Sequence, residues 1–274
     1  MAIDLAKKYS NLVDETFTTE SKSSLVVNSD YDFVGAKSIA IYSVGTSELN
    51  DYGRNTEGTS RYGTPKDLAT DIQEVQMEED KSFTFVIDKA DEDETMGALN
   101  AGTALARQIN EVVIPYVDKY VYKKMSDNAG TTATETITSA NAYESLATAN
   151  EVQDEASVPE QGRVAVVNPN YYKNLKADEK AVLDTEVGQE MRIKGVVGEM
   201  DGVAIQKVPS RLLPANTNFI LAHPVATTFA SKLAEYKIHT DAQGVSGSLV
   251  EGRIYFTAFV RNNKKSAIYV SKSA

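Results

Sequence analysis

The sequence predicts an α+β fold in which a long helix separates two groups of strands. Strand patterns with a two-residue alternation come first, and an apolar stripe with a spacing of three and four residues then runs through 95–125. Helix and strand patterns alternate from 141 to 235, and two further strand patterns close the chain. At 274 residues, the chain is long enough for one large domain or two smaller ones.

Residues 1–30 mix isolated apolar positions with serine, threonine and charged residues, and neither the helical nor the strand period is sustained. We interpret them as an N-terminal arm. Residues 31–44 are rich in β-forming side chains, with Ile39 and Ile41 on one face. This alternation predicts the first strand.

Residues 45–82 contain a polar stretch punctuated by glycines and a proline, and a second strand is predicted over 81–88 with Phe83, Phe85 and Ile87 on one face. Two strands joined by so long an excursion predict a hairpin-like extended loop. Loops of this length inside a compact domain are usually functional or disordered.

The extended loop carries cations and a tyrosine that we select as candidate subunit-contact residues: Arg54, Arg61, Tyr62 and Lys66. Three spaced cations could bind phosphate, but in an acidic protein they are more often solvated or paired with carboxylates. Against an acidic surface of an identical neighbour they would form a subunit contact, so we favour partner binding over nucleic acid. Tyrosine suits an interface because both its ring and its hydroxyl can be satisfied there.

Residues 95–125 predict the strongest helix. Acidic residues precede it and lysines lie near its end, as the helix dipole favours. Pro115 lies inside it, where proline costs about 3 kcal/mol, so we expect a kink or a break there. One stripe is expected to form the core of this helix: Leu105, Ile109, Val112, Val113, Tyr116 and Tyr120.

The threonine-rich segment 126–140 predicts an exposed connection or an edge strand, and we place a domain boundary there. The mixed unit beyond it predicts helices over 141–156, after Pro169 and over 224–235, and strands over 163–168, 202–208 and 218–222. Two terminal strands are expected to join at the turn dipeptide Asn262-Asn263.

Composition excludes several functional classes. Lysine plus arginine is 28 against 39 for aspartate plus glutamate, and the net charge of −11 is opposite to that of a protein that holds nucleic acid through its phosphates. The absence of cysteine excludes disulfides and thiol chemistry. No run approaches the ~18 apolar residues of a membrane helix, and the first residues lack a signal-peptide core, so we expect a soluble protein made in the cytoplasm.

Catalytic and metal-binding motifs are also missing. Neither the G-x-S-x-G nucleophile elbow nor a glycine-rich phosphate-binding loop occurs. His223 and His239 lack the i,i+4 spacing with which two imidazoles share a metal, and the acidic run at 91–94 is explained by a solvated helix N-terminus. We therefore predict no catalytic residue, no cofactor and no metal site.

The order of arm, strand, long polar excursion, returning strand, long helix, mixed unit and terminal strands resembles the major capsid proteins of tailed bacteriophages, with the Hong Kong 97-type fold. The resemblance covers most of the chain. It is carried by the segments that begin NDYGRNTEGTSRYG, YESLATANEVQDEA and ILAHPVATTFASKL, at 50–121, 143–175 and 220–270.

This resemblance implies an N-terminal arm over 1–30, a peripheral domain over 31–128 and an axial domain over 129–238. The extended loop would occupy about 45–82 and a spine helix about 95–125. The terminal strands, 239–274, would return to the peripheral domain.

The same resemblance implies a structural protein that forms hexamers and pentamers and closes an icosahedral shell around double-stranded DNA. Its location would be the virion capsid, assembled in the cytoplasm of a bacterial host. A portal and a separate scaffolding protein would be its partners, its contact with DNA would be weak and non-specific, and it would have no membrane contact or catalytic residue. Two alternatives remain open: an encapsulin-like nanocompartment shell, and a soluble α/β enzyme without a recognisable motif.

Overall fold

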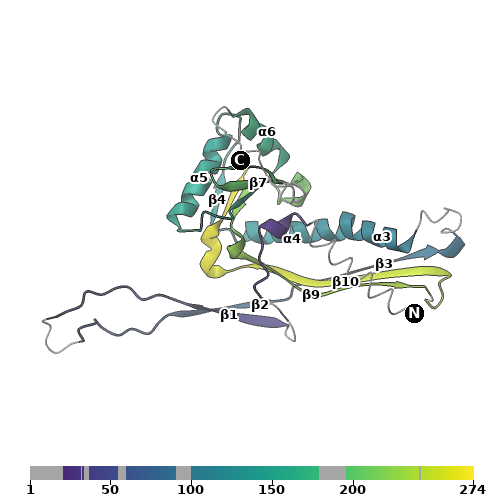
Figure 1. Cartoon of the computed structure of the whole chain (residues 1–274), viewed down its shortest axis with the longest axis horizontal. Coiled ribbons are helices and arrows are strands. Elements are labelled where there is room, and N and C mark those ends of the chain that lie inside the picture. Colours follow the sequence, from purple (N-terminus) through teal and green to yellow (C-terminus); the bar gives the residue numbers. More distant parts are fainter. Residues whose placement is uncertain are drawn as a thin grey trace.

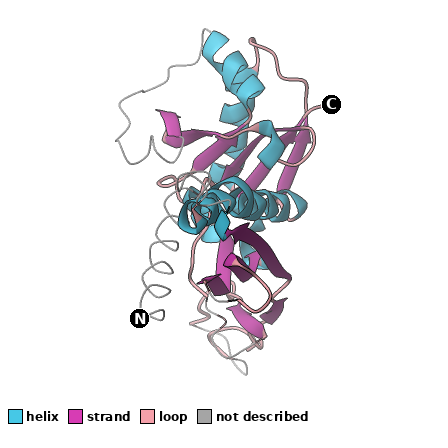
Figure 2. Ribbon diagram, turned by 90° about the vertical axis from the view of Figure 1, so that its right-hand side faces the viewer, coloured by secondary structure: helices cyan, strands magenta, loops and turns pink. Residues whose placement is uncertain are grey.

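The computed structural model describes residues 21–31, 33, 37–54, 60–90, 100–178, 196–240 and 242–274. Within them the strands form a two-stranded, a three-stranded and a six-stranded sheet. A two-stranded ribbon projects to the left in Figure 1, the three-stranded sheet and a long helix extend to the right, and the six-stranded sheet stands above. Figure 2 shows the long helix nearly end-on, between the two larger groups of strands.

The elements have the following bounds. The strands are β1 (Ser38–Val44), β2 (Thr70–Gln76), β3 (Glu79–Asp88), β4 (Thr131–Thr134), β5 (Val164–Val167), β6 (Val196–Met200), β7 (Val203–Lys207), β8 (Thr217–Ala222), β9 (Thr227–His239), β10 (Gly247–Val260) and β11 (Ile268–Lys272). The helices are α3 (Ala101–Gln108), α4 (Ile114–Asp127), α5 (Ala142–Glu155) and α6 (Pro169–Ala177), with a π turn, η2 (Ile109–Val113), between α3 and α4. The 3-10 helices are η1 (Ser23–Leu25), η3 (Ser210–Leu212), η4 (Pro224–Ala226) and η5 (Asn262–Ala267).

The long helix predicted around Pro115 is confirmed over 101–127. The helix does not break at Pro115, and η2 ends at Val113, two residues before the proline. In this turn the amide of Ile114 bonds the carbonyl of Ile109, five residues back. Proline has no amide and crowds the carbonyl four residues before it, and a local π turn accommodates both effects. The predicted start of the helix, at 95–99, falls outside the described residues.

The π turn also changes which face of the helix is buried. Because it holds an extra residue, later positions rotate by about 100° around the axis. Val112, expected in the core stripe, is 51% exposed, and Tyr116 is 39% exposed. Tyr120 is half-buried. Leu105, Ile109 and Val113 of the expected stripe are buried, and the helix also buries Ile114, Val117, Val121, Tyr122 and Met125.

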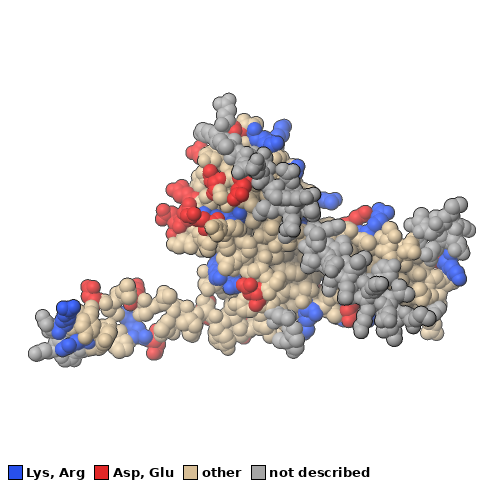
Figure 3. All heavy atoms as spheres, in the orientation of Figure 1, with Lys and Arg blue, Asp and Glu red and all other residues tan. Residues whose placement is uncertain are grey.

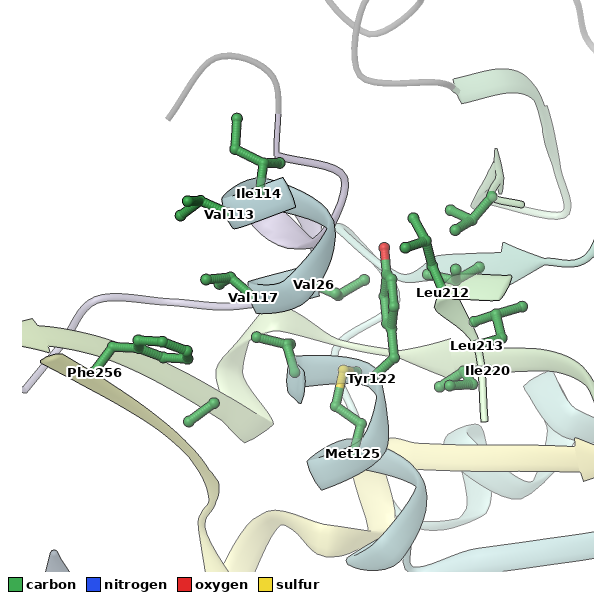
Figure 4. Close-up of a cluster of buried hydrophobic side chains, with 14 of the residues drawn as sticks. Val26, Val113, Ile114, Val117, Tyr122, Met125, Leu212, Leu213, Ile220 and Phe256 are labelled. Carbon is green, nitrogen blue, oxygen red and sulfur yellow. The ribbon is translucent and has the colours of Figure 1, made fainter. Parts of the chain in front are cut away.

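The main core lies between this helix and both larger sheets (Figure 4). Phe256 of β10 packs there, and so do Ile220 of β8 and Leu212 of η3. The alternation predicted over 81–88 is confirmed, since Phe83, Phe85 and Ile87 all face this core. Helices α5 and α6 pack on the other face of the six-stranded sheet in a second cluster.

The three-stranded sheet has the order β3-β10-β9 and is antiparallel. The helix predicted over 224–235 is wrong, because 227–239 forms β9. The spacing of Phe229, Leu233 and Tyr236 is typical of a helix, but twelve residue pairs with β10 and a bulge between Tyr255 and Phe256 place this segment in a strand. Long-range pairing therefore decides the structure of this segment.

The six-stranded sheet has the order β4-β11-β8-β5-β7-β6. The strands predicted over 163–168, 202–208 and 218–222 and the helices predicted over 141–156 and after Pro169 are confirmed, and the threonine-rich segment supplies the edge strand β4. The chain between β10 and β11 forms η5 instead of a tight hairpin turn. It carries the last strand into this sheet, where β11 pairs with β4 and β8.

These pairings differ from the boundaries expected at 238 and 239. Strand β9 lies in the three-stranded sheet, although it falls within 129–238, and β11 lies in the six-stranded sheet, although it falls within 239–274. The polypeptide therefore crosses between the two groups of strands once more than the sequence order indicates. The physical reason is that η5 leads the chain away from the end of β10 toward β8.

Candidate subunit-contact surfaces

The projecting ribbon, residues 38–76, is an antiparallel pair of β1 and β2 with a long excursion between them. Its pairing runs from Ser38 opposite Gln76 to Val44 opposite Thr70, and the amide of Gly45 adds a bond to Ala69 at 2.8 Å. The partner of the first strand is therefore β2, whereas the strand predicted over 81–88 pairs with β10. Residues 77–78 alone connect the ribbon to β3.

Near the far end of the ribbon the two sides meet again. The amide of Gly53 donates to the carbonyl of Arg61 at 3.0 Å, and the rings of Tyr52 and Tyr62 meet edge to face, with their centroids 5.1 Å apart. Gly63 has a φ of +89°, which an L side chain adopts only with strain, and this allows the chain to turn beside Asn50. The described residues on the two sides of the excursion are therefore in direct contact near its far end.

All four candidate residues lie on this excursion and are exposed. Arg54, Arg61 and Tyr62 lie near its far end, and Lys66 lies on the returning side. Tyr62 is 80% exposed. None of the three cations forms an ion pair with a described residue, so their charges face solvent in the isolated subunit.

The ribbon also carries a set of exposed apolar side chains that the sequence analysis missed, apart from Tyr62. Leu49 is fully exposed and Leu68 is 54% exposed. The complete set is Tyr42, Val44, Leu49, Tyr52, Tyr62, Leu68 and Ile72. Most large exposed apolar residues of the described chain lie on this ribbon. Tyr42, Val44 and Ile72 face outward in the alternation of β1 and β2, whereas Leu49, Tyr52 and Leu68 lie on the excursion, outside any strand.

The root of the ribbon is attached to the body by one apolar cluster and one side-chain clamp. Phe33, Val75, Met77, Ala230 and Phe259 form the buried cluster, with Ile39 and Ile41 packed against it. Gln73 donates from Nε2 to the carbonyl of Val260 at 2.9 Å and accepts from the amide of Asn262 at 3.0 Å. The direction of the ribbon is therefore determined by its root.

Two tyrosines of the long helix anchor the junction between the ribbon and β3. The hydroxyl of Tyr116 donates to Glu79 at 2.7 Å and that of Tyr120 donates to Glu78 at 2.9 Å, while both rings pack edge-on against Phe256. Lys124 pairs with Glu78 at 2.6 Å. These two predicted core residues therefore act at the margin of the core, where their hydroxyls reach carboxylates.

Hydrogen bonds from cationic side chains lower the pKa values of two carboxylates at this junction, Glu78 and Asp80. Burial raises the pKa of Glu78, but the hydrogen bonds from Lys124 and Tyr120 outweigh it and leave that pKa below its ordinary value of 4.5. The hydrogen bond from Arg253 lowers the pKa of Asp80 below 3.8. Both carboxylates are therefore charged at neutral pH and hold their cations.

The described part of the N-terminal arm is held on the same helix. Ser21 and Ser23 donate their hydroxyls to the buried carboxylate of Asp118, each at 2.7 Å. Val26 is fully buried in the main core, and Asn28 exchanges main-chain hydrogen bonds with β9. The segment from Ser21 onward is thus part of the folded body, and the arm residues 1–20 lie outside the described structure.

The described residues contain no group of three or more histidine, aspartate or glutamate side chains placed to hold a metal ion. Within the same residues no helix is long and apolar enough to cross a membrane. His223 caps η4 by accepting from Val225 at 3.1 Å, and His239 lies 3.3 Å from Glu251, so the two histidines have separate local roles.

Comparison with known families decides between the remaining classes. A family model described as phage capsid protein matches residues 73–270, which is more than half of the chain. The chain belongs to the phage capsid protein family. This capsid protein is a structural component of the virion shell, and a homo-oligomer is its working state. No curated protein matches it.

Solved structures show that the fold of this capsid protein is of the Hong Kong 97 type. A chain of Mycobacterium phage Che8 is 20% identical with a TM-score of 0.71, covering 92% of this chain and 90% of that one. The capsid of cyanophage P-SCSP1u gives 16% identity and a TM-score of 0.69, with 91% and 86% covered. A virus-like particle from Pyrococcus furiosus is 10% identical with a TM-score of 0.59, covering 97% of this chain and 98% of that one.

Proposed function

We propose that this capsid protein is the major subunit that forms the hexamers and pentamers of an icosahedral phage head enclosing double-stranded DNA. The observation that carries the proposal is the projecting ribbon with its exposed apolar side chains. An isolated two-stranded ribbon is at most marginally stable in water. Apolar patches that remain exposed on a folded subunit mark interaction surfaces. The ribbon therefore gains its stabilising contacts by lying on a neighbouring copy.

The proposed contact uses both kinds of side chain found on the ribbon. Leu49 and Leu68 would be buried against the neighbour, while Arg54, Arg61 and Lys66 would meet its carboxylates. The net charge of −11 makes cations on one projecting segment complementary to much of the surface of another copy. Tyr62 would contribute ring area and a hydroxyl at the same contact.

The other partners follow from this role. A scaffolding protein and a portal are expected during assembly in the bacterial cytoplasm. Contact with the enclosed DNA is expected to be weak and non-specific, because the excess of carboxylates opposes phosphate binding. Weak contact would leave the genome free to be packaged and ejected.

Sedimentation velocity on the purified protein tests the proposal, with the fast fraction imaged by negative-stain electron microscopy. The chain is expressed alone and together with the head genes of its phage. Rings of five and six or closed shells are expected, with DNA as the content of filled particles. A protein that stays monomeric in both expressions would overturn the proposal, and shells that contain an enzyme in place of DNA would indicate a nanocompartment.

A further inference from the structure

Exposed carboxylates gather at one end of the six-stranded sheet. We call this the acidic face: Glu151, Asp154 and Glu155 at the end of α5, and Glu160 in the turn before β5. All four are exposed, and residues 145–162 contain no lysine or arginine. An ordinary solvated surface mixes positive and negative side chains. On the acidic face the exposed charges are of one sign only.

Exposed cations gather elsewhere on the same unit. We call this the basic face: Lys173 and Lys176 of α6, Lys207 at the end of β7, and Arg211 of η3. Residues 169–177 and 202–216 contain no aspartate or glutamate. The ammonium groups of Lys176 and Lys207 both lie 5.5 Å from the centroid of the Tyr172 ring. Two like charges therefore form cation–π contacts with the same ring.

The two faces lie at opposite ends of parallel strands. The turn that carries Glu160 leads into the first residue of β5, whereas Lys207 lies opposite Val167, the last residue of β5. In Figure 3 acidic side chains gather on the left flank of the upper unit, and basic side chains lie along its top and right edge. The subunit therefore carries negative charge on the acidic face and positive charge on the basic face, which lie on different sides (Figure 3).

Within the described residues these charges find little compensation. Asp154 pairs with the buried Arg163 at 2.6 Å, and the other seven charged side chains form no ion pair with a described residue. Like charges held close together repel, and a surface of the opposite sign relieves that repulsion. Each face therefore fits a partner that carries the charge of the other.

We propose that the acidic face of one copy contacts the basic face of the next, in a head-to-tail arrangement around the hexamer and pentamer. A contact between two different faces of identical subunits forms a ring where its rotation closes and a filament where it does not, whereas a contact of one face with itself stops at a dimer. The inference rests on the proposed function and names the surfaces that would join neighbouring subunits around a capsomer.

Charge reversal tests the pairing. The acid-reversed variant carries Glu151→Lys, Glu155→Lys and Glu160→Lys, and the base-reversed variant carries Lys173→Glu, Lys176→Glu and Lys207→Glu, so the net charge of each changed face is reversed. All six positions are exposed and without ion pairs in the described chain, so wild-type unfolding temperatures are expected. Each variant is expected to lose rings and shells in sedimentation and electron microscopy. The combined variant, with both faces reversed and the wild-type net charge, is expected to recover both.

Mixing the two reversed variants gives a sharper result. One then has two basic faces and the other two acidic faces, so favourable contacts require strict alternation around the ring. Six subunits can alternate and five cannot. The mixture is therefore expected to recover six-membered rings without five-membered ones, and so without closed shells.

The inference fails if either reversed variant assembles like the wild type, or if folded variants fail to assemble and neither the combined variant nor the mixture recovers. A reversed variant that does not fold is replaced by a milder one, Glu151→Gln with Glu155→Gln or Lys173→Gln with Lys176→Gln, which is expected to weaken ring formation. Added salt should also weaken rings of the wild type through screening. A wild type that never assembles contradicts the proposed function, whereas a wild type that assembles beside insensitive variants contradicts this inference alone.

Discussion

The buried carboxylate of Asp118 accepts hydrogen bonds from both the hydroxyl and the amide of Ser23, at 2.7 and 3.1 Å, across 95 positions of the sequence. Ser21 and the amide of Lys22 complete its shell. A carboxylate that is only 1% exposed needs such partners, because burying an unpaired charge costs several kcal/mol. This contact joins the N-terminal arm to the long helix.

Replacing Asp118 by alanine is expected to release the arm residues. The change leaves the hydroxyls and amides at 21–23 without their acceptor, and hydrogen bonds to a charged group contribute about 1.5–3 kcal/mol each. Hydrogen exchange should become faster at 22–28, and the unfolding temperature should fall. Asp127→Ala is the control, because Asp127 is exposed on the same helix. Equal exchange in both variants would show that the carboxylate does not hold the arm.

Ile109→Asp is expected to abolish soluble protein. Ile109 is 1% exposed, and an unpaired buried carboxylate costs several kcal/mol against a total stability of about 5–15 kcal/mol. Val112→Asp is the matched control, three residues away on the exposed face created by the π turn. Soluble yield and circular dichroism distinguish the two variants. If Val112→Asp fails and Ile109→Asp folds, the assigned face of the helix is wrong.

Deletion of residues 53–63 is expected to leave a folded subunit that cannot close a shell. The segment lies beyond the paired part of the ribbon, and no residue of it belongs to a described buried cluster. Circular dichroism and thermal unfolding should therefore match the wild type, while electron microscopy should show no closed shells. Normal shells from the deleted protein would contradict the role assigned to the ribbon.

Acidification is expected to loosen the junction between the ribbon and β3. A carboxyl group whose pKa is lower in the folded state stabilises the fold above its unfolded pKa and loses that contribution as the pH falls through the folded pKa. Glu78 and Asp80 are both of this kind. The unfolding temperature should hold from neutral pH to about pH 5 and fall below it. Glu78→Gln should show a smaller fall than the wild type, and Glu48→Gln, an exposed change on the ribbon, should behave like the wild type.

Sequence patterns predicted most of the elements correctly where the determining interactions are local. The alternation of Phe83, Phe85 and Ile87 indicated a strand face, and the apolar repeat around Ile109 indicated a long helix. The charged and aromatic residues of the extended loop, Arg54 and Tyr62 among them, were placed correctly on an exposed segment. Such patterns report burial along one element and need no knowledge of its partner.

Those patterns could not predict which distant segments pair with one another. Whether 227–239 becomes a helix or a strand depends on β10, and whether β1 pairs with β2 or β3 depends on which edge is free. The exposure of Val112 depends on a π turn over 109–113, shortly before Pro115, that the ideal helical period does not include. The acidic and basic faces arise from segments that the six-stranded sheet brings to its opposite ends.

The sequence by itself therefore determined the elements, the position of the long helix, the exposed loop and the resemblance to a capsid protein, because each depends on residues close together in the chain. The tertiary structure alone decided the partners of β1 and β11, the anchoring of Ser23 on Asp118 and the two charged ends of the subunit. These depend on contacts between residues far apart in sequence, whose free energies no local pattern contains.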